Sequence, residues 1–289
     1  MRAYTTLARP SLTHIPRLGS PSRSVIALKG HSARLYSAAA EATLQVEDRD
    51  RVRWITLNRP KSHNAIAVRD LDDLAHAVES ASDDPAVRAI AVQGAGKSFC
   101  AGMNTRAFEG LDRAGARAVI SKVGRAVGSL RTSPKPTAVL LHGYVLGAGF
   151  ELALAADFRV ALPGTKVGLP ETKVGIPSVL DAALLRDHVG LSLAKEMLLI
   201  GDVYPIEHLG PHFVNAVGGK EENGLQAAAA ALLAKVTDLS PVAMKSQKEL
   251  NEMWMNTPLK EAIDISIDVF ADVFVDPATH EAIEKYNKK

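Results

Sequence analysis

The sequence predicts an α/β fold followed by a helical region, and three observations support this. Between residues 41 and 217, short apolar segments rich in β-branched residues alternate with segments whose apolar residues recur at helical spacing. A Gly-rich turn in the middle of this range joins an apolar strand to a run of good helix formers. After residue 217 the expected elements are all helices. This order is typical of one α/β core, residues 41–217, with an appended helical region, residues 218–289.

The core opens with a predicted β-hairpin. Residues 42–46 and 52–57 are the expected strands, joined by the charged turn Glu47–Asp50. Pro60 cannot donate to a strand ladder, so the second strand ends before it. The elements expected next are a helix at 68–80, a strand at 87–92, a Gly-containing turn at 98–103 and a helix at 112–130.

The central segment is a strand, a Gly-rich turn and a helix. Residues 137–141 are apolar and partly β-branched, which predicts a buried strand, and a helix is expected to start near Ala148. The turn between them contains three glycines within seven residues. The start of a helix presents free backbone N–H groups and the positive end of the helix dipole. The segment therefore suits a negatively charged oxygen, with the carboxylate of Glu151 close by; the alternative is a tight turn with a surface glutamate.

The remaining elements follow the same logic of short strands and then helices. Pro241 and Pro258 stand near two predicted helix starts, where a proline is well tolerated. The expected elements are strands at 158–161 and 166–169, a loop at 170–177, helices at 179–186 and 191–200, a turn with a short helix at 201–210, a strand at 213–217, and helices at 225–236, 241–255 and 259–270.

Composition excludes several classes of protein. At 289 residues and 47% hydrophobic content the chain can bury a large core, and no run approaches the ~18 apolar residues of a membrane span. The single cysteine, Cys100, excludes an internal disulfide framework and a Cys-rich metal site. We interpret it as a packed small side chain. The nine histidines show no metal-ligand spacing, so no metal is expected.

The first forty residues differ from the rest of the chain. They contain six basic residues, many Ser and Thr, and no Asp or Glu, which is the profile of a mitochondrial transit peptide. The segment Arg34-Leu35-Tyr36-Ser37 resembles a matrix processing site, so residues 1–36 are the predicted leader and the mitochondrial matrix the predicted location; the alternative is a basic tail. Without the leader, 28 basic and 32 acidic residues remain, so the charge does not indicate nucleic acid.

Two turns offer backbone donors of the same kind. Met103 follows Ala101-Gly102, and Ala148 follows Gly147, and each turn comes after a predicted strand. If the fold brings both turns together, the two N–H groups form an oxyanion hole.

Two carboxylates accompany these turns, Glu151 on the predicted helix and Glu171 after Leu169-Pro170. Two glutamates beside an oxyanion hole can hold and activate a water and deliver a proton.

With these residues the chain resembles the enoyl-CoA hydratase/isomerase (crotonase) family. The spacing of twenty between Glu151 and Glu171 is similar to that of its hydratase branch. The matching motifs, in chain order, are Asn58-Arg59-Pro60-Lys61 with Asn64-Ala65, Phe99-Cys100-Ala101-Gly102, Gly143-Tyr144 through Gly147-Ala148-Gly149-Phe150-Glu151-Leu152-Ala153, Ala156-Asp157, and Pro170-Glu171 with Gly175-Ile176-Pro177.

The resemblance implies a crotonase-like ββα spiral whose C-terminal helices assemble a homotrimer or hexamer. The implied substrate is an acyl-CoA thioester, so coenzyme A is part of the substrate and no separate cofactor is expected. Its carbonyl oxygen would accept the N–H groups of Met103 and Ala148. The residue matching Glu151 would help activate water, and the one matching Glu171 would protonate the α-carbon. The residues implied to line the substrate site are Lys61, Ala101, Gly102, Gly147 and Gly149.

The sequence leaves two alternative functions open. Isomerases of the family commonly keep one carboxylate as a proton shuttle, so Δ3,Δ2-enoyl-CoA isomerisation or another crotonase reaction is the second hypothesis. The third is a binding protein that holds acyl-CoA or RNA without turnover. The segment Gly175–Ala182 departs from the glycine-rich continuation of the usual hydratase, and Asn104 and Arg106 depart from the common Asp and Lys.

Two predicted helical surfaces are relevant to RNA binding and to assembly with other copies of the chain. The basic residues Arg113, Arg117, Lys122 and Arg125 could face an RNA, although a solvated helix face is favoured because apolar residues and glycines dilute the charge. Residues 241–270 carry more apolar side chains than one appended helix pair is expected to bury, which favours a trimer or hexamer.

Overall fold

The computed structural model describes residues 42–288, which lie in one compact unit spanning residues 39–289. The predicted leader, residues 1–36, lies outside the described residues.

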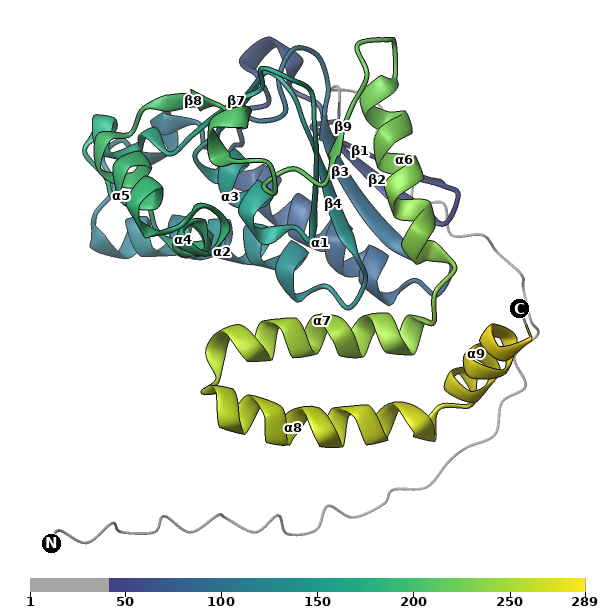
Figure 1. The fold of residues 1–289 in the computed structure, drawn as a ribbon. Coiled ribbons are helices and arrows are strands. Elements are labelled where there is room, and N and C mark those ends of the chain that lie inside the picture. Colours follow the sequence, from purple (N-terminus) through teal and green to yellow (C-terminus); the bar gives the residue numbers. More distant parts are fainter. Residues whose placement is uncertain (1–41, 289) are drawn as a thin grey trace, which may run out of the picture. The chain divides into compact units, whose positions relative to one another are not determined.

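A six-stranded sheet forms the centre of the described chain (Figure 1). The hairpin strands are antiparallel, and every other neighbouring pair is parallel. Its inner strands are buried almost throughout, as expected for parallel strands covered on both faces. In spatial order the strands are β1 (Leu44–Arg49), β2 (Val52–Leu57), β3 (Ala89–Gly94), β4 (Thr137–Leu141), β6 (Phe158–Ala161) and β9 (Ala216–Val217).

The hairpin turn is tighter than the sequence predicts. Strand β1 continues to Arg49 and pairs with Val52, so only Asp50 and Arg51 form the loop. Both have positive φ, 53° and 60°. A two-residue loop of this kind matches the twist of the two strands, which explains why the predicted four-residue turn is wrong.

Helices cover both faces of the large sheet. Helices α1, α2 and α3 share one apolar core with Ile55, Ile90 and Val139, whereas α6 packs against Trp54, Ala91 and Leu140 on the other face. Helix α6 falls within the range that the sequence assigns to the C-terminal helical region, yet it completes the core. The bounds are α1 (Val68–Asp83), α2 (Arg113–Thr132), α3 (Ala148–Ala155) and α6 (Gly224–Thr237).

A second, three-stranded sheet gives the chain its spiral form. An isolated parallel bridge between Cys100 and Val145 links the first turn of the spiral to it. Successive chain turns add a strand to the large sheet, a strand to the small one and then a helix, which is the predicted ββα spiral. The sequence predicts the middle strand but not its neighbours, because segments of three residues have too little periodicity. In spatial order these strands are β5 (Tyr144–Leu146), β7 (Lys166–Gly168) and β8 (Val203–Pro205).

Short helical turns connect the strands. The helix predicted at 179–186 is divided at Leu185 into a 3₁₀ turn and a short α-helix, and Leu180 adopts a positive φ of 55°. The connecting elements are η1 (Pro60–Ser62), η2 (Thr105–Phe108), η3 (Pro170–Val174), η4 (Leu180–Leu184), α4 (Leu185–Val189), α5 (Leu191–Ile200) and η5 (Ile206–Leu209).

The C-terminal helices carry many of the large exposed apolar side chains. Helix α7 has no buried residue, and α8 has only Ala262. Within the described residues no single helix is long and apolar enough to cross a membrane; α6 and α7 meet that test only as a pair bent by 105°. The sequence does not predict the last helix. The bounds are α7 (Pro241–Asn256), α8 (Leu259–Asp272), η6 (Val273–Val275) and α9 (Pro277–Asn287).

Candidate active site

The two glycine turns predicted to act together lie side by side. The Cys100 N–H donates to the Tyr144 carbonyl at 3.1 Å, and the Leu146 N–H donates to the Cys100 carbonyl at 2.9 Å. A side chain on Gly102 would place its Cβ 2.8 Å from the Leu146 oxygen and 3.5 Å from Gly147 Cα. Both glycines have positive φ, 90° at Gly102 and 52° at Gly147. The close approach and the backbone angles therefore both require glycine.

The backbone geometry leaves the N–H of Met103 available. Ile66 donates to the Gly102 carbonyl and accepts from the Asn104 N–H, at 2.8 and 2.9 Å. Because a strand residue flanked by these two bonds directs its own N–H to the opposite side, the Met103 N–H faces away from Ile66. It donates to no other residue of the described chain.

The second N–H belongs to the first turn of helix α3. Ala148 is the first helical residue, so its N–H has no partner within the helix. The carbonyl of Gly147 accepts from Phe150 and Glu151, at 2.7 and 2.9 Å, while the Gly147 N–H donates to Gly168. Positive φ falls on Gly147 rather than on Ala148. An alanine is therefore compatible with this turn, although the sequence marks it as a departure.

Helix α3 is packed tightly enough to bury Glu151. A side chain on Gly149 would bring its Cβ within 2.5 Å of the Cys100 carbonyl, so only glycine permits this approach. Glu151 is 4% exposed. Burial, reinforced by the negative charges of Glu171 and Asp181, raises the pKa of Glu151 to about 8, although the backbone of Ala182 acts in the opposite direction. One of the two glutamates thus holds its proton at neutral pH.

Glu171 approaches the same place from the 3₁₀ turn η3. Its Oε1 lies 2.8 Å from where a Cβ on Gly147 would stand. Ser178 donates its hydroxyl to the other carboxylate oxygen at 2.8 Å. The carboxylate of Glu171 therefore lies beside the turn that precedes Ala148, and it acts electrostatically on Glu151. The four groups that the sequence selects are brought together.

Ser178, Asp181 and Arg131 also belong to this region, and the sequence does not single them out. Asp181 is 7% exposed, and the Nε of Arg131 donates to it at 2.8 Å. Ser178 and Asp181 fall in the segment that departs from the usual hydratase pattern, which is the one available signal. Arg131 has no sequence signal, because it lies fifty residues before its partner.

The other predicted substrate-site residues have more varied surroundings. Ala101 donates its N–H to the His63 carbonyl at 2.9 Å, which ties the Met103 turn to the segment after η1. Lys61 is exposed in η1 and forms no ion pair with another described residue.

Cys100 is fully buried, and burial raises the pKa of its thiol to about 12, which fits the interpretation as a packed side chain.

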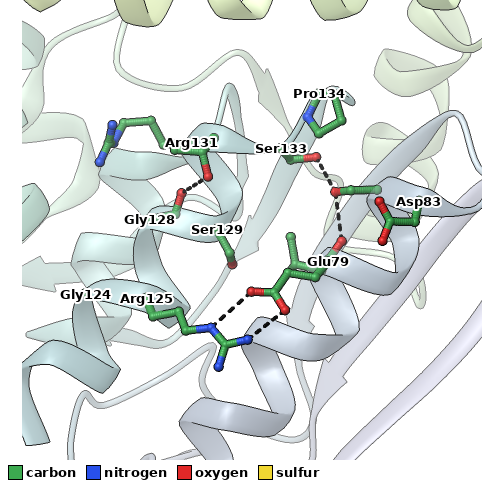
Figure 2. A pocket seen from close by; sticks show the side chains of 12 residues that line it. Glu79, Asp83, Gly124, Arg125, Gly128, Ser129, Arg131, Ser133 and Pro134 are labelled. Atoms are coloured by element: carbon green, nitrogen blue, oxygen red, sulfur yellow. Dashed lines mark hydrogen bonds and ion pairs between the residues drawn. The ribbon is translucent and has the colours of Figure 1, made fainter. Parts of the chain in front are cut away.

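The basic face of α2 is partly neutralised by α1. Lys122 pairs with Asp72, and Arg125 pairs with Glu79 at 2.8 Å. Figure 2 shows this second pair at a hollow of ≈ 580 Å³ between α1 and α2. Glu151 and Glu171 do not line that hollow, and neither do Met103 and Ala148. The pairing supports the solvated-face interpretation of these basic residues.

The described residues include no candidate metal-binding site. Residues 42–288 contain no group of three or more His, Cys, Asp or Glu side chains arranged to hold a metal ion.

Comparisons with known proteins agree on one family. A family model described as enoyl-CoA hydratase/isomerase matches residues 47–289. Crotonyl-CoA hydratase of Syntrophomonas wolfei subsp. wolfei is 30% identical over 231 residues, which cover 78% of this chain and 87% of that protein. The probable enoyl-CoA hydratase of Bacillus subtilis is 30% identical over 204 residues, covering 69% of this chain and 78% of that protein.

Solved structures agree with the sequence comparison. Pseudomonas aeruginosa DspI superposes with a TM-score of 0.80 at 28% identity, covering 88% of this chain and 97% of that chain. A putative enoyl-CoA hydratase from Streptomyces coelicolor A3(2) gives 0.77 at 30% identity, covering 89% and 96%.

Proposed function

This chain belongs to the enoyl-CoA hydratase/isomerase family, and we propose that it is a hydratase that adds water to the double bond of a 2-enoyl-CoA thioester. The observation that carries the proposal is that the carboxylate of Glu171 lies beside the turn before Ala148 and close enough to the buried Glu151 to raise its pKa. Its hydratase relatives are consistent with this reaction.

The two backbone donors supply the first half of the mechanism. The thioester oxygen accepts the N–H groups of Met103 and Ala148. As water adds to the β-carbon, negative charge develops on that oxygen, and fixed donors at a helix N-terminus stabilise it. Because the donors are backbone groups, side-chain changes at Met103 should affect catalysis little.

The two carboxylates supply the second half. Glu151 helps to activate the water, and Glu171 delivers the proton to the α-carbon. Since its pKa is raised to about 8, Glu151 carries a proton at neutral pH. For these roles that proton must pass to Glu171 before turnover, which leaves Glu151 ionised to accept a proton from water and gives Glu171 the proton that it delivers. Ser178 holds one oxygen of Glu171 and leaves the other directed at Gly147. Water addition needs both tasks, whereas moving a double bond needs only one group that takes and returns a proton.

The test measures hydration and 3-enoyl-CoA isomerisation side by side. Glu151→Gln and Glu171→Gln should each lower hydration by roughly 10² or more. CoA-thioester binding should survive in both, because neither side chain holds the thioester oxygen. Glu196→Gln is the matched control: this glutamate bonds to Tyr204 at an exposed position and should retain full activity. A protein that isomerises but does not hydrate, and that still isomerises after loss of one glutamate, is an isomerase instead.

We also propose that the protein is a homotrimer or hexamer. The supporting observation is the exposed apolar surface of α8, where Leu259 is 77% exposed, Ile267 65% and Phe270 67%. Light scattering at micromolar concentration tests this, and a monomer would contradict it.

We propose that residues 1–36 direct the chain to the mitochondrial matrix and are then removed. The support is the acid-free, Arg-rich composition of that segment. N-terminal sequencing of the protein from its native source should find a start near Ser37, and an intact Met1 on organellar protein would contradict it.

A further inference from the structure

A third buried carboxylate, that of Asp181, lies on η4, which packs against the helix α3 that carries Glu151. Asp181 is at the start of η4, is 7% exposed, and raises the pKa of Glu151 through its negative charge. Burying a carboxylate near another carboxylate is costly unless a cation is provided. The chain provides one in Arg131, whose Nε lies 2.8 Å from Asp181 Oδ1.

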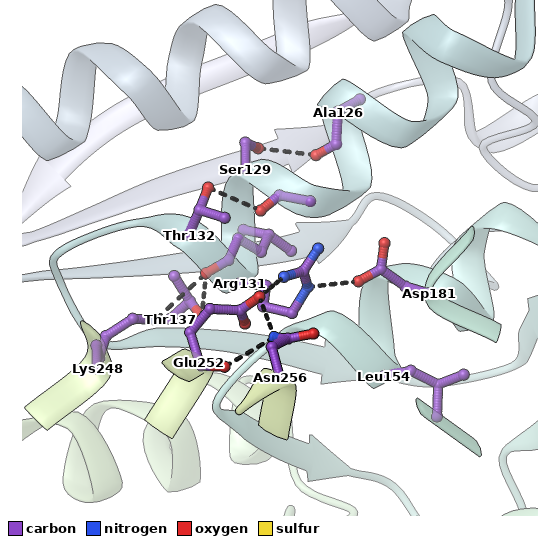
Figure 3. A network of polar contacts seen from close by, with 12 residues as sticks. Ala126, Ser129, Arg131, Thr132, Thr137, Leu154, Asp181, Lys248, Glu252 and Asn256 are labelled. Atoms are coloured by element: carbon purple, nitrogen blue, oxygen red, sulfur yellow. Dashed lines mark hydrogen bonds and ion pairs between the residues drawn. The ribbon is translucent and has the colours of Figure 1, made fainter. Parts of the chain in front are cut away.

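Arg131 extends this contact to the C-terminal helices. It lies near the end of α2 and uses a second nitrogen, Nη1, to pair with Glu252 of α7. The same Glu252 oxygen accepts from Asn256 at 3.2 Å. Figure 3 shows Arg131 between Asp181 and Glu252, with Asn256 next to Glu252. Asp181, Arg131 and Glu252 therefore form a continuous polar link from η4 to α7.

The charged groups around α3 divide between its two ends. Near Glu151, the groups that act on it are Glu171 from η3 and Asp181 from η4. At the far end, Arg159 donates to the carbonyls of Ala153 and Ala156, and the ring of His188 bonds to the carbonyl of Leu154. Both side chains thus contact the carbonyl end of the helix, and Asp181 is the one group at the Glu151 end that is paired directly with a cation within the described residues.

Asp181 also follows Ser178 by three residues in the same segment. Ser178 donates to Glu171, and Asp181 lies beside Glu151. One short segment therefore carries a polar group that acts on each proposed catalytic glutamate. This is also the segment in which the sequence departs from the usual hydratase pattern.

We propose that Asp181 is a positioning residue of the hydration site, fixed by Arg131 and, through Arg131, by Glu252 of helix α7. It holds the Ser178–Asp181 segment against both glutamates and keeps a fixed negative charge beside Glu151. The proposal rests on the proposed hydratase function. It adds that the packing of α7 against α2 affects the active site through Arg131.

The first test is Asp181→Asn, which keeps the shape and removes the charge. The limb of the kcat/KM–pH profile that reports Glu151 should move to lower pH by roughly one unit, because a nearby negative charge no longer favours the protonated form. Asp187→Asn is the matched control: Asp187 lies on α4, is more than half exposed, and pairs only with Arg186. Its profile should equal that of the wild type.

The second test is independent of turnover. A carboxyl-carbon NMR titration follows Glu151, whose signal is assigned by its absence in Glu151→Gln. The midpoint should fall in Asp181→Asn and stay in Asp187→Asn. If the wild type hydrates no 2-enoyl-CoA but the midpoint still falls, the hydratase function is wrong while the link between Asp181 and Glu151 stands. If hydration is normal and neither midpoint nor profile moves, the present inference alone is overturned.

The third test concerns the α7 end of the link. Glu252→Gln should move the profile in the same direction by a smaller amount, because Arg131 is then less neutralised. Glu249→Gln, on the same helix in an exposed pair with Lys245, is the control and should have no effect. Arg131→Lys should retain most of the wild-type profile and Arg131→Met should not. Equal profiles for Glu252→Gln and Glu249→Gln would exclude coupling through α7.

Discussion

Helices α3 and α8 both carry several large apolar side chains, yet α3 is buried and α8 is largely exposed. Every residue of α3, Ala148–Ala155, is buried, whereas α8 buries only Ala262. Helix α3 has apolar neighbours on all sides, including Phe99, Val139 and Val167. Helix α8 packs against α7 and leaves Leu259, Ile267 and Phe270 exposed. The difference indicates that the core holds α3 firmly in place, while the exposed apolar face of α8 supports the proposed assembly.

The largest expected effect is in the core helix. Leu152→Ala removes a fully buried side chain of α3 and should lower the free energy of unfolding by about 2–5 kcal/mol, because the cavity cannot collapse fully. Denaturant unfolding measures it. A loss below about 1 kcal/mol would show that α3 is less constrained than its burial indicates.

Next is the start of the same helix. Ala148→Pro removes the proposed oxyanion donor at the first helical position, where proline is otherwise tolerated, and should lower kcat by roughly 10²–10³. Ala148→Ser keeps the N–H and is the control. Circular dichroism must first show that the proline variant is folded. Normal turnover by a folded Ala148→Pro enzyme would exclude this donor.

The pH profile tests how burial of α3 sets the chemistry. The proposed reaction needs one proton on the Glu151–Glu171 pair, so kcat/KM should fall about tenfold per pH unit above about 8, where Glu151 gives up that proton to solvent. A profile that instead rises as pH increases through 8 would show that the reaction does not use a proton held by this pair.

The smallest effect is expected on α8. Ile267→Ala, at a side chain 65% exposed, should change the stability of dilute protein by less than about 0.5 kcal/mol. If copies of the chain cover this face, the change in Tm should grow with protein concentration, since assembly stabilises by mass action. A change that is large and independent of concentration would place Ile267 in the monomer's own core.

The crotonase-family resemblance drawn from the sequence motifs is confirmed by the family match over residues 47–289. Apolar residues at helical spacing also predict α1, and short continuous apolar runs predict the parallel strands, because both patterns report a locally buried face. Good helix formers predict α3. The prediction is wrong where few residues decide the structure. The two-residue hairpin loop at Asp50-Arg51 and the short strands β5 and β8 carry no periodic signal.

The sequence by itself determined the two glycine turns and the two glutamates, because these depend on local backbone angles and on residue types in fixed order, and its resemblance to the crotonase family implied the ββα spiral. Only the tertiary structure decided how deeply Glu151 is buried, and hence its raised pKa. It also decided that Arg131 meets both Asp181 and Glu252. Such contacts join residues from separate turns of the spiral. A charged side chain carries no local sign of its partner, so pairing across fifty or more residues appears only once the helices are packed.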